Sequence, residues 1–453
     1  MNLNSHMPFR AIMQLLMLLS ISALIAACSA SLTFDIEANG KSSGELRTTS
    51  PEAVGIDSDR LESIAAAMQG LVDEGLLAGV VTMASRDNRV IHFESVGYRD
   101  LESRAPMTND TLFRIYSMTK PVTGVALMIL YEEGKFNLSD PVEQYIPELK
   151  DLRVYAGTDS SGNMLTEEAD HPMTIRELMS HTGGLTYGIF AQSPVDSAYL
   201  ASRLDAAAAA GVLEPGETSQ DFVRKLGQIP LKHQPGTRWE YSVSVDVQGY
   251  LVEVLSGQSF GSFLQERLFD PLGMIDTHFY VPPDKLDRFA QVYAYDDSGE
   301  LTPSELFPGT DYTTYPDFEA GGSGLVSTAS DYMRFSQMLL NGGELNGTRI
   351  LSPLTVSLMN RDQSPVGVDI SVFGRGGTSF GLDFAVVTDP VEAESYSKGE
   401  YSWGGAAGTW FWIDPVEKIV FIGMIQVSGA FTPDVRGISH RLLYQSIMEP
   451  YGI

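Results

Sequence analysis

A serine and a lysine three residues apart carry the clearest chemistry in this chain. The motif reads Ser117-Met118-Thr119-Lys120, and at helical spacing its hydroxyl and amine share one face. A serine needs a neighbouring base before it can attack a carbonyl carbon, and an amine can be that base. The pair therefore predicts Ser117 as a nucleophile that is activated by Lys120, without any histidine.

The segment that follows the serine supports this interpretation. Its pattern predicts a helix from about 117 to 133, ended by Gly134, with almost no polar face. Pro121 fits the opening turn of such a helix. Burial disfavours a charged ammonium group, so a buried Lys120 could be neutral enough to accept a proton. The helix N-terminus would also favour the alkoxide that develops on Ser117.

The same motif occurs a second time, so the letters alone are weak evidence. Ser395 and Lys398 repeat the spacing inside an acidic, polar segment, with Gly399 directly behind them. No apolar helix follows, so nothing would keep water from that lysine. For Ser117 the alternative is a capping serine beside a solvated lysine. An apolar helix disfavours that alternative, because it leaves Lys120 no polar face.

Two later segments could complete a site. Tyr241 lies in a loop just before a predicted helix. A strand near the C-terminus contains two adjacent glycines, which let backbone closely approach a substrate. By themselves, a tyrosine is more often a packing residue and the glycines could mark a β-bulge. The strand residues are Trp403, Gly404, Gly405 and Ala406.

In this order and spacing, the three segments resemble the serine β-lactamase and penicillin-binding protein superfamily, in its class C-like part. Within it, the sequence is most similar to the family VIII carboxylesterases, over about residues 51–453. The resemblance implies that Tyr241 and Lys120 share the proton of Ser117 and pass it to the leaving group. It also implies an oxyanion hole formed by the backbone N–H groups of Ser117 and Ala406.

Two departures from the β-lactamase pattern bear on the substrate. Val243 stands where the tyrosine motif normally ends in an asparagine that contacts an amide. Trp403 and Gly404 replace the lysine and threonine of K-T-G, which help to hold a substrate carboxylate. We therefore expect Val243, Trp403, Gly404 and Gly405 to bind uncharged, apolar acyl groups, and we expect ester hydrolysis. Action on β-lactams or D-alanyl peptides, acyl transfer, and a non-catalytic envelope-binding protein remain alternatives.

Other motifs are expected to be structural. Residues 257–261 and 377–381 both match G-x-S-x-G, but that elbow must follow a strand and open a helix. The first follows a helical pattern, and the second leads from a glycine-rich loop into a strand. His181 opens the segment His-Thr-Gly-Gly, and residues 319–324 read as a glycine-rich turn beside the site.

Composition excludes several classes of function. The 453 residues include 58 acidic and 30 basic side chains, which gives a formal net charge of -28. Such a surface repels phosphate backbones, so we expect no nucleic-acid partner. None of the seven histidines forms H-E-x-x-H, and phosphate-loop and EF-hand patterns are absent. We therefore expect no metal and no cofactor, and a small ester or amide as the substrate.

The first 27 residues read as an export signal. Arg10 is the only Lys, Arg, Asp or Glu before Cys28, and residues 11–27 are almost wholly apolar. The small residues before Cys28 resemble a lipoprotein cleavage site, so Cys28 would carry a lipid anchor. Residues 28–50 would be a flexible tether. We expect a bacterial cell-envelope protein, anchored to the outer membrane and facing the periplasm. An ordinary cleaved signal or an uncleaved anchor is the alternative.

The remaining pattern predicts an α+β protein. Two strand-like runs flank Asp87 and Asn88, a hairpin signal, and further strands follow residue 382. Helices fill the middle of the chain. We therefore expect an antiparallel β-sheet flanked by helices, with an inserted all-helical subdomain. The sheet part would span about 51–115 and 311–453, and the helical part about 116–310. The resemblance implies an active site between these two parts.

Overall fold

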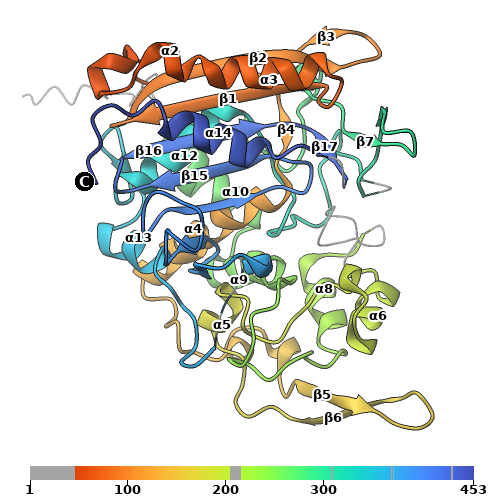
Figure 1. Cartoon of the computed structure of the whole chain (residues 1–453). Coiled ribbons are helices and arrows are strands. Elements are labelled where there is room, and N and C mark those ends of the chain that lie inside the picture. The colour runs from red at the N-terminus through yellow and green to blue at the C-terminus, as the bar shows by residue number, and fades with distance from the viewer. Residues whose placement is uncertain are drawn as a thin grey trace, which may run out of the picture. The chain divides into compact units, whose positions relative to one another are not determined.

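An eight-stranded antiparallel sheet spans the upper half of the molecule in Figure 1. Its order is β12-β13-β14-β15-β16-β1-β2-β3, so early and late parts of the chain meet in one sheet. The early strands are β1 (Gly79–Arg86), β2 (Arg89–Asp100) and β3 (Ala105–Pro106). The late strands are β12 (Thr378–Phe380), β13 (Ala385–Val387), β14 (Tyr401–Gly404), β15 (Trp410–Asp414) and β16 (Ile419–Met424). The α+β prediction is confirmed.

The computed structural model describes residues 46–204, 216–307, 310–368, 370, 372–429 and 432–452, all within one compact unit. The predicted signal sequence, Cys28 and most of the predicted tether lie outside these residues. None of the described helices is long and apolar enough to cross a membrane.

Both faces of the sheet are covered, which explains why its central strands are apolar throughout. Every residue of β1 is buried; Val80 belongs to one core cluster and Val81 to the other. Because successive side chains of a strand alternate, neighbouring residues of β1 serve opposite faces. One face packs against α2 (Ser58–Leu61), α3 (Ser63–Asp73) and α14 (Val435–Tyr444). The other packs against α12 (Ala329–Leu340).

Helices dominate the part of the chain between the early and late strands. They include α4 (Thr119–Glu132), α5 (Ile175–Met179), α6 (Pro194–Ala201), α8 (Ser219–Leu226), α9 (Ser244–Ser256), α10 (Phe260–Leu264) and α11 (Asp270–Leu272). The helix α4 is buried along most of its length and packs against α9. Both helices lie below the sheet in the view of Figure 1, and α4 carries Lys120. The short helix α13 (Pro353–Met359) follows α12.

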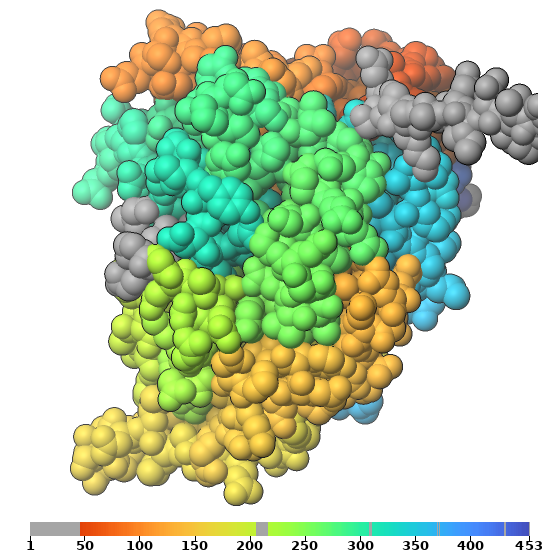
Figure 2. All heavy atoms as spheres, turned by 180° about the vertical axis from the view of Figure 1, so that it is seen from behind, coloured from red at the N-terminus to blue at the C-terminus, as the bar shows by residue number. Residues whose placement is uncertain are grey.

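The helical part is not purely helical. It carries a hairpin of β5 (Arg153–Thr158) and β6 (Met164–Glu168), which extends from the lower end of the molecule in Figures 1 and 2. The strands β7 (Tyr293–Tyr295) and β8 (Leu301–Pro303) join β17 (Val427–Ser428) in a three-stranded sheet. Two-stranded pairs are formed by β4 (Phe113–Arg114) with β9 (Val326–Ser327), and by β10 (Glu344–Leu345) with β11 (Thr348–Arg349). Of these strands, β5, β6, β7 and β8 lie within the predicted helical part at about 116–310, so that part is mainly but not wholly helical.

Two local predictions can be compared directly with the backbone. Asp87 and Asn88 form the β1–β2 turn with φ of 50° and 59°, the two positive values that suit a tight hairpin. The apolar helix begins later than expected. Ser117 lies in the short 3-10 turn η2 (Tyr116–Met118), and the α-helix starts at Thr119.

Candidate active site

The nucleophile candidate lies on a strained turn at the start of α4. Tyr116, directly before Ser117, has φ of 41°, a left-handed conformation that costs a non-glycine residue free energy. The N–H of Ile115 donates to the carbonyl of Leu325 at 3.1 Å, which fixes the turn to a distant loop. Ser117 is half-buried, so its hydroxyl can meet a substrate, whereas Lys120 is only 1% exposed.

The amine of Lys120 has three oxygen partners. Its Nζ lies 3.3 Å from Ser117 Oγ, 3.2 Å from the Tyr187 hydroxyl and 2.7 Å from the carbonyl oxygen of Gly322. An ammonium group can donate to all three. A neutral amine can donate to Tyr187 and Gly322 and accept from Ser117, because hydroxyls both donate and accept. The contacts therefore suit both protonation states, as a base requires.

Tyr241 meets this amine with its ring rather than with its hydroxyl. Lys120 Nζ lies 4.7 Å from the ring centroid, within the range of a cation–π contact. The indole N–H of Trp403 donates to the Tyr241 hydroxyl at 3.4 Å, a long hydrogen bond. The ring also packs against Tyr187 and Phe373, with centroids 5.4 Å and 5.3 Å away. An aromatic wall therefore lines one side of the amine.

The end of β14 lies against the turn that carries the nucleophile. A Cβ added to Gly405 would come within 2.5 Å of the Ile115 carbonyl oxygen, so only glycine fits there. Trp403 and Gly404 occupy the strand itself, and Ala406 is exposed just beyond it. The strand thus lies beside Ser117 as the prediction requires. The oxyanion role of the Ser117 and Ala406 amides stays a prediction.

Val243 contributes no open surface. Its side chain is fully buried directly before α9, so it presents no surface to a substrate, contrary to the binding role predicted for it. An apolar residue there leaves no amide to contact a substrate.

His181 supports Tyr241 from behind. Its Nδ1 is 2.9 Å from Ser242 Oγ, and its ring centroid is 5.0 Å from that of Tyr241. Complete burial, and secondly the charge of Lys120, hold the pKa of His181 well below its usual range. A neutral imidazole that packs and hydrogen-bonds agrees with the structural role expected for this segment.

The glycine-rich segment 319–324 contributes more than a turn. The Gly321 carbonyl accepts a hydrogen bond from Thr123 Oγ1 at 2.7 Å, one turn along α4 from Lys120. The Gly322 carbonyl accepts from Lys120 itself, and the Gly322 N–H donates to Asp246 Oδ1 at 2.9 Å. The loop therefore joins α4 to α9 next to the Lys120 amine.

Two buried carboxyl groups also lie near this amine. Burial raises the pKa of Asp246 to about 7, and the positive charge of Lys120 opposes the shift. Burial likewise raises the pKa of Asp383 well above its usual value, against a hydrogen bond from Gln248 and the charge of Lys120.

The roles of Tyr187 and Asp246 in the site were not predicted from the sequence, and Gly322 was placed in a turn beside the site without its contact to Lys120. Tyr187 follows His181 by six residues, and Asp246 lies between two valines near the start of a predicted helix. The second feature was a usable signal, because ionisable residues in buried surroundings cluster at functional sites.

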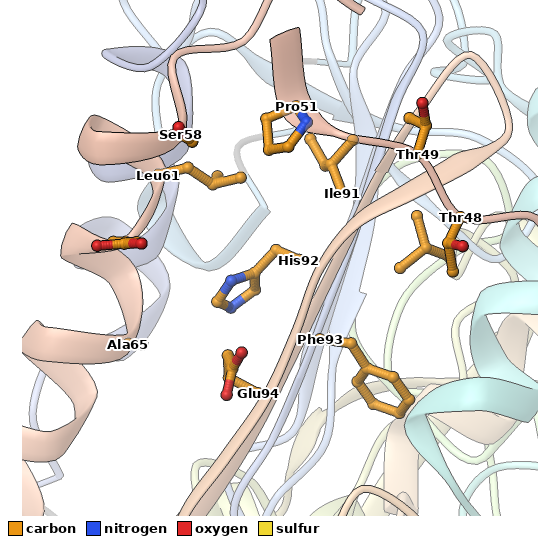
Figure 3. Close-up of a pocket in the computed structure, with 12 residues that line it drawn as sticks. Thr48, Thr49, Pro51, Ser58, Leu61, Ala65, Ile91, His92, Phe93 and Glu94 are labelled. Atoms are coloured by element: carbon orange, nitrogen blue, oxygen red, sulfur yellow. The ribbon is translucent and has the colours of Figure 1, made fainter. Parts of the chain in front are cut away.

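A separate pocket of about 430 Å³ lies between α3 and β2. Figure 3 shows His92 and Glu94 pointing from β2 toward the helix that carries Ala65, with Phe93 on the other side of the strand. His92 Nε2 is 2.7 Å from Thr82 Oγ1, and burial lowers the pKa of His92 to about 4. This pocket contains no activated nucleophile. Over the part of the chain that the structure describes, no group of three or more His, Cys, Asp or Glu could hold a metal.

Comparisons with known proteins agree with the geometry. The chain is 38% identical to an uncharacterized protein of Mycobacterium tuberculosis, over 81% of this chain and 90% of that one. It is 29% identical to esterase EstB of Burkholderia gladioli, over 80% of this chain and 89% of the esterase.

Among solved structures, EstCE1, described as a hydrolase with promiscuous acyltransferase activity, superposes with a TM-score of 0.70. The two sequences are 25% identical, and the match covers 87% of this chain and 99% of EstCE1. The family model described as Beta-lactamase matches residues 64–445. With its fold, its Ser117–Lys120 pair and its relatives among esterases and acyltransferases, this chain belongs to the beta-lactamase family.

Proposed function

We propose that this protein is a serine carboxylesterase that forms an acyl-enzyme on Ser117. The observation that carries the proposal is the 3.3 Å contact between Ser117 Oγ and the buried Lys120 amine. A nucleophilic serine needs such a base within hydrogen-bond reach, and burial keeps that base away from bulk water.

In the acylation step, Lys120 takes the proton of Ser117 as Oγ bonds to the acyl carbon. The carbonyl oxygen becomes an oxyanion, which the N–H groups of Ser117 and Ala406 would stabilise; one such donor is typically worth about 3–4 kcal/mol. Lys120 then returns the proton toward the leaving alcohol as the C–O bond breaks. Delivery through the Tyr241 hydroxyl, which contacts Trp403 in this structure, would need the Tyr241 ring to shift toward the amine. The products are free alcohol and acyl-Ser117.

In the deacylation step, water attacks the acyl carbon while the same groups take its proton. The bond between the acyl carbon and Ser117 Oγ breaks, and the proton returns to Oγ. The released acid leaves the enzyme in its starting state. Lys120 can carry out both steps because its other partners, Tyr187 and Gly322, accept hydrogen bonds in either protonation state.

The walls of the site favour esters with apolar acyl groups. Trp403, Tyr241 and Phe373 pack into one contiguous aromatic cluster, and Val243 is fully buried. A lactam or peptide carries an amide and a carboxylate, which such a surface cannot pair, and unpaired buried polar groups lower affinity. The esterase name of EstB supports the same choice.

A second candidate is transfer of the acyl group to an acceptor other than water. EstCE1 is described as a hydrolase with promiscuous acyltransferase activity, and the same acyl-Ser117 could serve both reactions. The acceptor decides between them, so product analysis with added alcohol distinguishes hydrolysis from transfer.

The test compares turnover of p-nitrophenyl butyrate with turnover of a chromogenic cephalosporin, using Ser117→Ala as the control. Ester cleavage that is lost in the variant is the expected result. Preferential cleavage of the cephalosporin would contradict the role given to Trp403 and Val243. A protein that turns over no ester, lactam or peptide would instead be a binding protein on this fold.

We also propose that the protein is exported and anchored through a lipid on Cys28, to the outer membrane facing the periplasm. The pattern of residues 1–28 supports this. Expression of the full chain in a Gram-negative bacterium with labelled palmitate should label wild type but not Cys28→Ser. Equal labelling of the two proteins would contradict the anchor, and cytosolic retention would contradict export.

A further inference from the structure

A single residue, Gly322, connects a buried acid, Asp246, to the amine of Lys120. Asp246, on α9, accepts a hydrogen bond from the Gly322 N–H at 2.9 Å. The carbonyl of the same glycine accepts from Lys120 Nζ at 2.7 Å. Gly322 is therefore held on one side by the acid and holds the amine on the other.

The packing at this glycine leaves little freedom. A Cβ added to Gly322 would lie 2.6 Å from Asp246 Oδ2 and 3.0 Å from Oδ1, so the carboxyl group rests directly on the glycine. A Cβ on Gly321 would lie 2.5 Å from the Val245 carbonyl oxygen. Because the loop packs this closely against α9, we expect a substitution that changes the shape of residue 246 to shift the Gly322 carbonyl, which accepts the hydrogen bond of Lys120.

Packing alone does not explain an acid at this position. Asp246 is fully buried between Val245 and Val247, and among the described residues its Oδ2 has no hydrogen-bond partner. Leaving a buried polar atom unsatisfied typically costs about 1–3 kcal/mol. Acids that destabilise a fold are found where their charge serves a function. The positive charge acting on this acid is that of Lys120.

We propose that Asp246 is a positioning residue for the reaction, an inference that rests on the proposed function. Its carboxyl group fixes Gly322, so that the Gly322 carbonyl aims the Lys120 amine at Ser117 Oγ. When it is ionised, this carboxyl group also stabilises the ammonium that forms as the proton of Ser117 moves to Lys120 Nζ. In this step the O–H bond of Ser117 breaks and an N–H bond forms on Lys120, while Ser117 Oγ bonds to the acyl carbon.

Several other titratable groups face the same amine. They are Tyr187 and Tyr241, His181, which is neutral, and Asp383, whose Oδ1 accepts a hydrogen bond from Gln248 at 3.0 Å. Asp383 differs from Asp246 in having no hydrogen bond to Gly322 among those that the structure describes. The two acids can therefore be separated by mutation.

The test uses two substitutions at position 246. Asp246→Ala removes both the charge and the acceptor of the Gly322 N–H. Asp246→Asn keeps the shape and an acceptor oxygen but removes the charge, so it carries the test if the alanine variant does not fold. The matched control is Asp331→Asn. That acid is also buried and accepts a backbone hydrogen bond, from Asp276 at 2.7 Å, but on α12.

The readouts are p-nitrophenyl butyrate kinetics and the rate at which a fluorophosphonate probe labels Ser117. For Asp246→Ala we expect kcat and labelling to fall about 100-fold with KM nearly unchanged, because only base positioning is lost. For Asp246→Asn we expect kcat and the labelling rate to fall about tenfold. We also expect the acid limb of its pH–rate profile to move to lower pH, because the ammonium of Lys120 loses a nearby negative charge. Asp331→Asn should leave labelling and the profile unchanged.

Two outcomes would overturn this role. Folded Asp246 variants that label Ser117 at the wild-type rate show that the acid does not position the base. An equal loss in Asp331→Asn shows a general effect of removing a buried acid. Wild type that is not labelled at Ser117 would instead overturn the proposed function itself. Wild type that is labelled without cleaving esters would leave the Asp246 test intact through the labelling rate.

Discussion

The chain contains the S-x-x-K spacing twice, and the two segments have opposite surroundings. At Ser117 the lysine is 1% exposed and contacts the serine hydroxyl at 3.3 Å. At Ser395 the lysine, Lys398, is exposed, and the serine donates to Glu400 Oε2 at 3.1 Å instead. The first segment opens the buried helix α4, whereas the second lies in turns before β14.

The comparison shows that the motif acquires its chemistry from what surrounds it. A lysine in water keeps its proton and its hydration, so it cannot serve as a base near neutral pH. The amine of buried Lys120 contacts the hydroxyls of Ser117 and Tyr187 and a backbone carbonyl in place of bulk water. Ser395 has a carboxylate partner, and its segment offers no buried amine. Equal spacing therefore predicts two candidates, and burial selects one.

Removing each serine in turn should give the largest contrast. Ser117→Ala is expected to lower kcat for an ester by about 10⁴-fold or more, because the acyl-enzyme cannot form. Ser395→Ala should stay within about twofold of wild type, since it touches no part of the site. Steady-state kinetics with p-nitrophenyl butyrate measures both. A comparable loss in both variants would break the comparison.

Removing each lysine should give the next largest effect. Lys120→Met keeps the apolar stem without the amine, and we expect a fall in kcat of about 10³-fold as the base is lost. Lys398→Met should change only solubility. Fluorophosphonate labelling, followed by mass spectrometry, checks whether Ser117 remains reactive. Normal labelling of Lys120→Met would mean that another group activates the serine.

Removing each tyrosine hydroxyl tests which phenol serves the amine. Tyr241→Phe should lower kcat about 100-fold if its hydroxyl passes the proton to the leaving group. Tyr187→Phe should cost about tenfold, the loss of one hydrogen bond to Lys120. Leaving groups of different basicity make the measurement sharper, because a good leaving group needs no proton. The reverse order of effects would transfer the proton-handling role to Tyr187.

The effect of burial on an ionisable side chain can also be tested at His92, which lies outside both S-x-x-K segments. Burial lowers the pKa of His92 from the usual 6.5 to about 4. Between these two pH values the imidazole is protonated in the unfolded chain but neutral in the folded protein. Stability should therefore fall as the pH drops from about 6.5 to 4, by about 3 kcal/mol for this group. His92→Gln should remove that part of the acid sensitivity. Urea unfolding at pH 7 and pH 4 measures it, and identical losses in the two proteins would contradict the burial argument.

Much of the fold and the central pair of the site were predictable because their signals are local. Helical spacing placed Ser117 beside Lys120, and the Asp87-Asn88 pair marked a turn whose positive φ values those residue types tolerate. The β5–β6 hairpin was predictable too but was missed. Asp159 accepts from the N–H groups of Ser161 and Asn163, which is recognisable turn chemistry.

The sequence by itself determined the α+β class and the proximity of Ser117 to Lys120, and it led to the proposal that the first is a nucleophile and the second its base. Tertiary structure alone decided which groups surround the amine. Tyr187 lies 67 residues beyond Lys120 in the sequence, and Gly322 lies 202 residues beyond it. Periodicity describes neighbours within a few turns, so it cannot assign contacts that only the packing of α4 against α9 and the 319–324 loop creates.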